Sequence, residues 1–154
     1  MACTYQDAGN QATTTSGNKT ATSLASIAGL RPAIYEFTIG AAGPPNSTDC
    51  DILYTLQSWT TSAGTSTAFT PYPTDPGFQA AKAACGTNFT AEPTYTANAY
   101  LWGPMGINQR ATYRWVAAPG MLLTLVGTAT TGAGMEVQSP NYATQTNATL
   151  YHQE

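Results

Sequence analysis

Side chains that could act as acids, bases or metal ligands are scarce in this chain. The sequence has 5 basic and 8 acidic residues among 154, so charged residues make up 8% of it, against about 25% in an ordinary domain. The one close pair of carboxylates is Asp49 and Asp51, which would point to the same face of a strand. Calcium requires about six to eight oxygen ligands, and no other acid lies nearby in the sequence. Solvated acids in a turn are the favoured interpretation of this pair.

The sequence offers little support for a catalytic site. Glu36 and Glu92 could form the carboxylate pair of a glycosidase, but nothing in the sequence brings them together. A Ser-His-Asp or Cys-His site would require His152, the single histidine, which lies close to the C-terminus, where chains are often mobile. No GxSxG, P-loop, GxGxxG or HExxH motif occurs. We therefore expect no enzymatic activity and no cofactor, and a small hydrolase is the least favoured alternative.

The cysteines do not indicate a metal site. Cys3, Cys50 and Cys85 are odd in number, and no two of them form a CxxC pair. A zinc site needs about four ligands that converge, and a single histidine cannot complete one. Small buried thiols are the favoured interpretation, and a Cys50–Cys85 disulfide is the alternative.

The composition excludes further classes of function. Thr, Ser, Ala and Gly make up nearly half of the chain, and the only basic residues are two Lys and three Arg. So few cations cannot neutralise many phosphates, so we expect no nucleic-acid partner. The longest apolar run, at residues 121–126, is far shorter than the roughly 20 residues of a membrane span, so we expect no membrane partner. The first residues lack a basic segment followed by an apolar one, and we expect no signal peptide.

The spacing of apolar residues predicts an all-β protein. Residues alternate between apolar and polar over short segments, which are separated by frequent Gly and Pro turns. One short helix is expected over about residues 76–85, because Asp75 suits the N-cap, Pro76 the first helical position and Gly86 the position after the helix. The predicted fold is an antiparallel jelly roll or β-sandwich of about eight short strands. The segments expected as strands are 34–39, 52–57, 67–70, 94–101, 111–116, 121–126, 135–137 and 142–151.

Residues 1–30 differ from the rest of the chain. They are small and polar, with the Thr13, Thr14 and Thr15 run and with few large apolar residues such as Leu24. Such a stretch cannot build a core alone. We expect an extended N-terminal arm over residues 1–30 that orders against a partner, with a weak first strand as the alternative, followed by a single β-domain over residues 31–154.

A few aromatic and basic residues are candidates for contacts with a partner. Trp59, Tyr72 and Trp102 flank turns, where they could stack on sugar rings or on a neighbouring subunit, although packing in the core is favoured. Arg110 and Arg114 would share one face of a strand. They could anchor a carboxylate of a partner or pair internally with an acid such as Glu92, and both alternatives stay open.

Two segments carry a resemblance to a known family. They are Asn88-Phe-Thr-Ala-Glu-Pro-Thr-Tyr-Thr-Ala-Asn98 and Asn108-Gln-Arg-Ala-Thr-Tyr-Arg-Trp-Val-Ala-Ala-Pro-Gly120. In these segments the chain resembles small virion proteins of tailed bacteriophages, of the capsid decoration (cement) type with a jelly-roll fold. The similarity covers roughly residues 30–152. It implies a homotrimeric β-domain on the outside of an icosahedral shell, which bridges subunits of the major capsid protein.

The sequence thus leads to a structural hypothesis. The protein would be made in the host cytoplasm and located on the capsid surface of the virion, with its arm lying against the shell. Truncating residues 1–25 should then abolish capsid binding and leave the domain folded. The alternative is a receptor- or carbohydrate-binding jelly-roll module on a phage fibre or head surface. The candidate partner-binding residues are Thr13, Thr14, Thr15, Leu24, Trp59, Tyr72, Trp102, Arg110 and Arg114.

Overall fold

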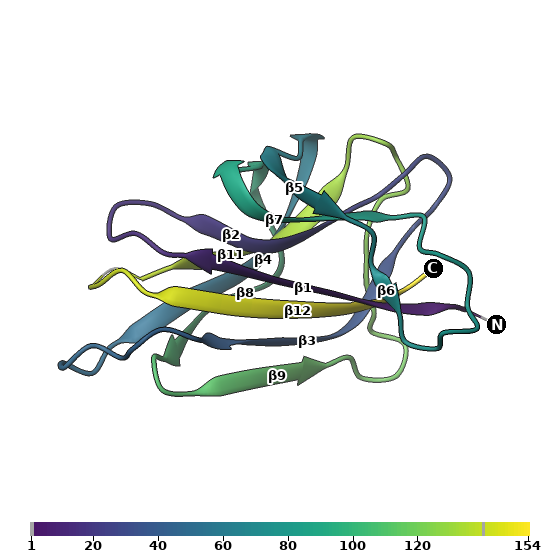
Figure 1. Cartoon of the computed structure of the whole chain (residues 1–154). Helices are drawn as coiled ribbons and strands as arrows, with labels where there is room; N and C mark the ends of the chain where they lie inside the picture. Colours follow the sequence, from purple (N-terminus) through teal and green to yellow (C-terminus); the bar gives the residue numbers. More distant parts are fainter. Residues whose placement is uncertain (1, 140) are drawn as a thin grey trace.

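The computed structural model describes residues 2–139 and 141–154, and in this part of the chain all regular structure is β (Figure 1). No helix is found among these residues. The strands are β1 (Thr4–Ala12), β2 (Lys19–Ala25), β3 (Ala33–Ala41), β4 (Asp51–Ser62), β5 (Thr65–Phe69), β6 (Tyr72–Pro73), β7 (Ala84–Ala91), β8 (Thr94–Asn108), β9 (Thr112–Val116), β10 (Leu123–Thr124), β11 (Gly132–Gln138) and β12 (Gln145–Gln153).

The strands form two antiparallel sheets that pack as a β-sandwich. Sheet I has the order β10-β3-β12-β1-β6, and β9 pairs with the same strand, β3, as β10 does. Sheet II has the order β5-β7-β2-β11-β4-β8. The first four strands alternate between the sheets, so β1 and β3 lie in sheet I while β2 and β4 lie in sheet II. The all-β prediction and the two-sheet antiparallel sandwich are confirmed.

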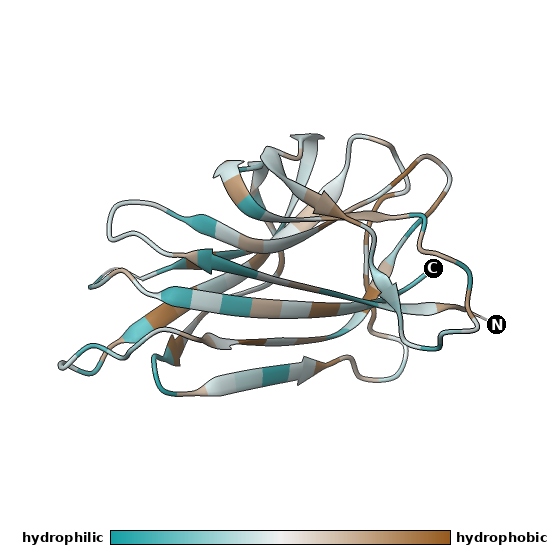
Figure 2. Ribbon diagram, viewed as in Figure 1, coloured by the Kyte–Doolittle hydropathy of each residue, from teal (hydrophilic) through white to brown (hydrophobic). Residues whose placement is uncertain are grey.

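The core lies between the two sheets and depends on the alternation of side chains along each strand. Ile52, Tyr54 and Leu56 of β4 are buried, as are Phe37 and Ile39 of β3. Strands bury alternate residues because successive side chains point to opposite faces. Figure 2 shows this alternation of polar and apolar residues along β12. The pattern that predicts strands in the sequence therefore also predicts which side chains fill the core.

An aromatic cluster joins the two sheets. Trp115 of β9 stacks on Phe37 of β3 at 5.2 Å between ring centroids, and Trp102 of β8 meets Phe37 edge-on at 4.9 Å. Tyr113 stacks on Trp102 at 5.5 Å. Aromatic pairs in these geometries contribute about 0.5–1.5 kcal/mol beyond the area they bury. The cluster therefore fixes β9 of sheet I against β8 of sheet II.

The expected N-terminal arm is replaced by two strands inside the sheets. β1 pairs with both β12 and β6, and β2 pairs with both β11 and β7. The sequence pattern is weak here because several buried positions hold polar residues, among them Asp7, Thr20 and Thr22. Paired neighbours on both sides satisfy the backbone groups of these strands, so small polar side chains suffice. Described residues 2–30 are thus part of the sandwich, and the prediction of an arm that orders only on a partner is wrong.

The helix expected at residues 76–85 is also wrong. Asp75 does cap a turn, because its side chain accepts a hydrogen bond from the Gly77 N–H at 2.8 Å and its carbonyl accepts one from the Phe78 N–H at 2.9 Å. The turn does not continue as a helix, since a helix of about ten residues is marginal without tertiary support. Instead, the chain from Ala84 onward forms β7, which occupies the position between β2 and β5.

Candidate functional site

One edge of sheet I exposes an unusual run of apolar residues. β9 and β10 together form this edge, because β9 pairs with the Glu36–Gly40 part of β3 and β10 pairs with Ala33 and Ile34. We call the segment from Val116 to Val126 the apolar edge. Among the described residues, no strand pairs with its outer side.

The apolar edge combines exposure with a lack of charged residues of its own, and Arg31 borders it, because its Nε donates to the Leu125 carbonyl at 3.5 Å. Val116 is 52% exposed, Met121 68% and Val126 60%, and Leu122 is also exposed. Between Arg114 and Glu136 the chain contains no charged residue. The segment contains Pro119, and proline is one of the devices that protect strand edges. Its contiguous exposed apolar residues nevertheless indicate an interaction site. These features make the apolar edge a candidate interaction surface.

The backbone holds the apolar edge in a defined shape. The Ala117 N–H donates to the Tyr35 carbonyl at 2.8 Å, and the Leu125 N–H donates to the Pro32 carbonyl at 2.9 Å. Between these anchors the Met121 N–H donates to the Ala118 carbonyl, which closes a turn. Gly120 has a φ of 81° in this turn, a value that favours glycine. Met121 and its neighbours are therefore presented on an ordered loop.

Arg114 on β9 pairs within the protein. Its Nε donates to Oε1 of Glu36 at 2.6 Å and its second terminal nitrogen donates to Oε2 at 3.0 Å. These hydrogen bonds lower the pKa of Glu36 and raise that of Arg114. The internal pairing left open by the sequence is therefore formed, with Glu36 in place of Glu92. Arg110 lies in the turn before β9, where its guanidinium donates to the Asn46 carbonyl at 3.4 Å.

The other candidate partner-binding residues do not converge. Thr13 is buried and donates to the Thr144 carbonyl at 3.1 Å, whereas Thr14 and Thr15 lie in the turn that joins β1 to β2. Leu24 is fully buried in the core. Tyr72 is 68% exposed on β6, at the edge of sheet I opposite to the apolar edge.

The two candidate tryptophans, Trp59 and Trp102, are packed against other residues of the protein. The Trp59 ring is buried and lies over Gly132, where an added Cβ would collide with it. Trp102 is half-buried in the aromatic cluster. Stacking of Trp59 on a sugar ring would require the ring to leave this position, so the structure gives no support to a glycan site built on these two tryptophans.

The acidic residues considered in the sequence analysis lie in different parts of the fold. Glu36 lies in sheet I, whereas Glu92 follows β7 of sheet II, where it meets Nζ of Lys19 at 3.3 Å and accepts the Thr20 N–H at 2.8 Å. Asp49 accepts hydrogen bonds from the side chains of Asn108 and Gln109, which lower its pKa. Within the described residues, no group of three or more His, Cys, Asp and Glu could hold a metal ion.

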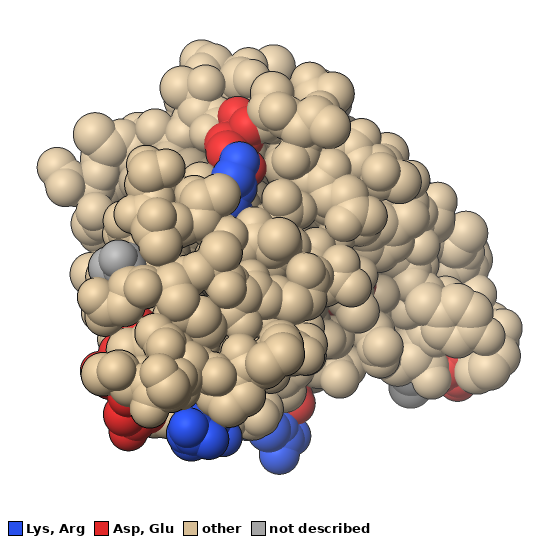
Figure 3. Space-filling view, turned by 60° about the vertical axis from the view of Figure 1, so that its left-hand side comes forward, with Lys and Arg blue, Asp and Glu red and all other residues tan. Residues whose placement is uncertain are grey.

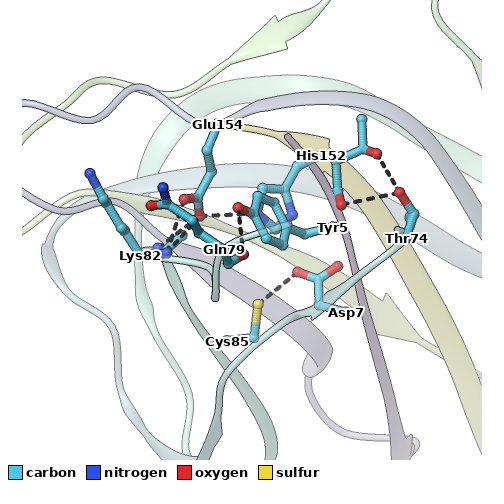
Figure 4. A network of polar contacts seen from close by, with 10 residues as sticks. Tyr5, Asp7, Thr74, Gln79, Lys82, Cys85, His152 and Glu154 are labelled. Atoms are coloured by element: carbon cyan, nitrogen blue, oxygen red, sulfur yellow. Dashed lines mark hydrogen bonds and ion pairs between the residues drawn. The ribbon is translucent and has the colours of Figure 1, made fainter. Parts of the chain in front are cut away.

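A buried polar cluster lies beneath the two ends of the chain, and sequence reasoning did not find it (Figure 4). The Cys85 thiol donates to Oδ2 of Asp7 at 2.8 Å. Burial raises the pKa of Asp7 to about 7 and raises the pKa of Cys85 well above its usual value. A reactive cysteine needs a lowered pKa, so the geometry assigns Cys85 a packing role. Cys3, Cys50 and Cys85 are all free thiols.

The same cluster contains His152 and the last residue of the chain. His152 stacks on Tyr5 at 5.5 Å between ring centroids, and its Nε2 lies 3.5 Å from Oε1 of Glu154. Burial lowers the pKa of His152 to about 4. Glu154 also accepts the backbone N–H groups of Lys82 and Ala83, at 2.9 and 2.8 Å. The cluster therefore fastens the irregular segment before β7 to β1 and β12.

Few charges interrupt the surface outside these contacts. Figure 3 shows a face on which Lys, Arg, Asp and Glu are confined to small groups within a wide area of uncharged residues. No helix in the described part of the chain is long and apolar enough to cross a membrane.

Comparison of the chain with known protein families, with curated protein sequences and with solved structures finds no match.

Proposed function

We propose that the protein is a structural virion protein that decorates the outside of a phage head and stabilises contacts between major capsid subunits. In this proposal it acts as a homotrimer. The observation that carries the proposal is the apolar edge, which exposes Val116, Met121, Leu122 and Val126 in a stretch that has no charged residue between Arg114 and Glu136. Such a surface favours burial against another protein over residence in water.

A jelly-roll topology is part of this proposal. Two four-strand orders within the sheets support it, namely β1-β12-β3-β9 in sheet I and β2-β11-β4-β8 in sheet II. In a jelly roll, eight strands form two Greek keys whose strands are shared between two facing sheets. β5, β6, β7 and β10 are then additions to this framework. Viral capsid and lectin domains are among the proteins that use it.

We assign the apolar edge to the contact between copies of the chain. A stable interface buries about 800 Å² from each partner, which is roughly a tenth of the 7386 Å² surface of one copy. The ordered loop needs little rearrangement, so a small loss of conformational entropy opposes its burial. Polar surface elsewhere, which carries few charges, is then left to face the shell.

The test is the mass of the purified protein by light scattering. The wild-type protein is expected near three times the 16.1 kDa mass of the chain. Met121→Lys combined with Val126→Lys places two charges in the proposed contact and should give a monomer, because a buried unpaired charge is strongly destabilising. The control is Tyr72→Lys, which changes an equally exposed residue at the opposite edge and should leave the trimer intact.

Co-sedimentation with phage heads tests the decoration role itself. The wild-type trimer should sediment with heads of the encoding phage, and the monomeric variant should bind them less tightly because it loses the avidity of three joined copies. A wild-type protein that is monomeric, or a trimer that stays in the supernatant with heads, contradicts the proposal.

A further inference from the structure

A hollow of about 150 Å³ lies on the outer face of sheet II, and none of its lining residues belongs to the apolar edge. β4 and β11 form its floor, and residues of β8 and of the turn before β2 border it. Its lining includes Asn18, Thr55, Tyr100, Pro104, Glu136 and Gln138.

The sheet register explains why these side chains share one face. Thr55 of β4 is paired with Glu136 of β11, and Leu53 is paired with Gln138. Paired residues on neighbouring strands point to the same side of a sheet. Residues i and i+2 of one strand also point to the same side. Thr55, Leu53 and their two partners therefore form one continuous patch.

Tyr100 supplies an aromatic wall. It is paired with Gln57 of β4, which lies on the same face as Thr55 because the two are separated by two positions. Tyr100 is 48% exposed, in contrast to the packed residues Trp59 and Trp102. An exposed aromatic face beside a polar floor can stack on an apolar ring face while the floor forms hydrogen bonds.

The polar groups of the hollow offer a mixed set of donors and acceptors. The Glu136 carboxylate is half-buried, and burial raises its pKa while a hydrogen bond with the Asn18 side chain lowers it. Gln138 and Asn18 each provide an amide with donor and acceptor atoms, and Thr55 provides a hydroxyl. A ligand that carries several hydroxyl groups matches this set, because each hydroxyl both donates and accepts.

Charge around the hollow disfavours an anionic ligand. Glu136 is the acid in the lining, and Glu92 lies close enough to raise its pKa. The nearby cation, Lys19, is already engaged by Glu92 at 3.3 Å. An anionic ligand would meet repulsion from the Glu136 carboxylate. The volume is about half the lower limit of roughly 300 Å³ for drug-sized ligands, which suits a single small ring.

We propose that this hollow binds one neutral saccharide ring, such as the terminal hexose of a surface glycan, with Tyr100 as the stacking platform and with Glu136, Gln138 and Asn18 as hydrogen-bonding partners. The proposal goes beyond the decoration function. A glycan contact on the outer face of sheet II would let a head-bound protein adhere to a cell surface while the apolar edge stays in the trimer.

The experiment is a glycan array that contains neutral and sialylated glycans, followed by titration with the methyl hexoside that corresponds to the strongest neutral hit. Wild-type protein should bind neutral glycans and should not bind the sialylated forms. Tyr100→Ala and Glu136→Gln should each weaken binding of the hexoside by about tenfold or more. Tyr100→Phe retains the stacking face and should bind nearly as the wild type does.

Two controls separate this proposal from folding defects and from the decoration function. Tyr72→Ala removes an exposed tyrosine on β6 of sheet I and should leave hexoside binding unchanged. The Met121→Lys, Val126→Lys variant should still bind the hexoside, because neither residue lines the hollow. A wild-type array without neutral hits, or hexoside binding that survives both Tyr100→Ala and Glu136→Gln, would overturn the proposal whatever the oligomeric state.

Discussion

At the residue scale, the buried pair of titratable groups Asp7 and His152 is the most informative feature. Burial raises the pKa of Asp7 from 3.8 to about 7 and lowers that of His152 from 6.5 to about 4. Each group is therefore held in its neutral form inside the protein near pH 6. Between about pH 4 and 6.5 the folded state keeps the Asp7 proton that the unfolded state loses, and it lacks the His152 proton that the unfolded state keeps. Their contributions to the pH dependence of stability have opposite signs.

The substitution Asp7→Asn should reveal the pH dependence that Asp7 contributes to stability, which the contribution of His152 opposes in the wild type. The folded pKa of Asp7 is raised, so its carboxyl contributes stability that is fully present below pH 3.8 and is lost as the pH rises toward 7. The difference in unfolding free energy between wild type and Asp7→Asn should therefore fall over this range, by up to about 1.4 kcal/mol per pH unit, and stay level above pH 7. Urea unfolding followed by tryptophan fluorescence at several pH values measures this difference.

The substitution His152→Gln tests the opposite dependence of stability on pH. The folded pKa of His152 is lowered, so its contribution is complete above pH 6.5 and is lost as the pH falls toward 4. The difference between wild type and His152→Gln should therefore increase as the pH rises from about 4 to 6.5. Two difference curves with the same slope would show that burial does not shift the two pKa values in opposite directions.

At the element scale, β1 and β2 determine how the sandwich is built. β1 lies between β12 and β6 in sheet I, and β2 lies between β7 and β11 in sheet II. The short turn between them contains Thr15 and passes from one sheet to the other. Removing the two strands would leave β12, β6, β7 and β11 each with an unpaired backbone edge, which is both costly and prone to aggregation.

Deleting residues 1–25 should therefore abolish cooperative folding, in contrast to the behaviour expected of a separable arm. The truncated protein should give poorly dispersed amide resonances and no thermal transition by circular dichroism. Thr15→Ala, in the exposed turn of the same segment, should change stability by no more than about 0.5 kcal/mol. A truncated protein that melts cooperatively would show that the segment is dispensable for the fold.

At the scale of the whole molecule, the ends of the chain are neighbours. Thr4 of β1 is paired with Gln153 of β12, and the Glu154 N–H donates to the Cys3 carbonyl at 3.0 Å. Figure 1 shows the N and C ends on the same side of the sandwich. Pairing of β1 with β12 must close a loop that includes nearly the whole chain, and loop closure of this kind slows the folding of β proteins.

A circular permutant should fold faster than the natural chain. A short Gly-Ser linker from Glu154 to Ala2 makes β12 and β1 a local hairpin, and new ends between Ala129 and Thr130 fall in an exposed loop. The refolding rate, measured by stopped-flow tryptophan fluorescence, should rise roughly tenfold because the closure entropy is smaller. An unchanged rate would show that the pairing of β1 with β12 forms after the rate-limiting step.

The fold class could be predicted from sequence because it depends on local pattern. Tyr54 and Leu56 alternate with Thr55 and Gln57, and a strand buries alternate residues whatever its partner is. Local pattern led to a wrong prediction at residues 76–85, where Asp75, Pro76 and Gly86 match the signals of a helix. Those signals describe local preferences of less than a few kcal/mol, and pairing of β7 with β2 and β5 outweighs them.

Candidate sites were less predictable because they depend on which residues meet. Val116, Met121 and Val126 are ordinary apolar residues in the sequence, and only their place on an edge without a partner makes them a surface. Likewise, Tyr100 and Glu136 are 36 positions apart in the chain and meet through the common strand β4. A signal that could have located the apolar edge is the absence of charge between Arg114 and Glu136.

The sequence by itself therefore determined the all-β class, the scarcity of charge and the core positions of strands such as β3 and β4, since each of these follows from composition or from a period of two along the chain. Tertiary structure alone decided that residues 4–25 form paired strands, that Arg114 meets Glu36, and that Asp7 and Cys85 share a buried site. The physical reason is that strand pairing joins residues far apart in the chain, and local preferences carry no information about which distant segment is the partner.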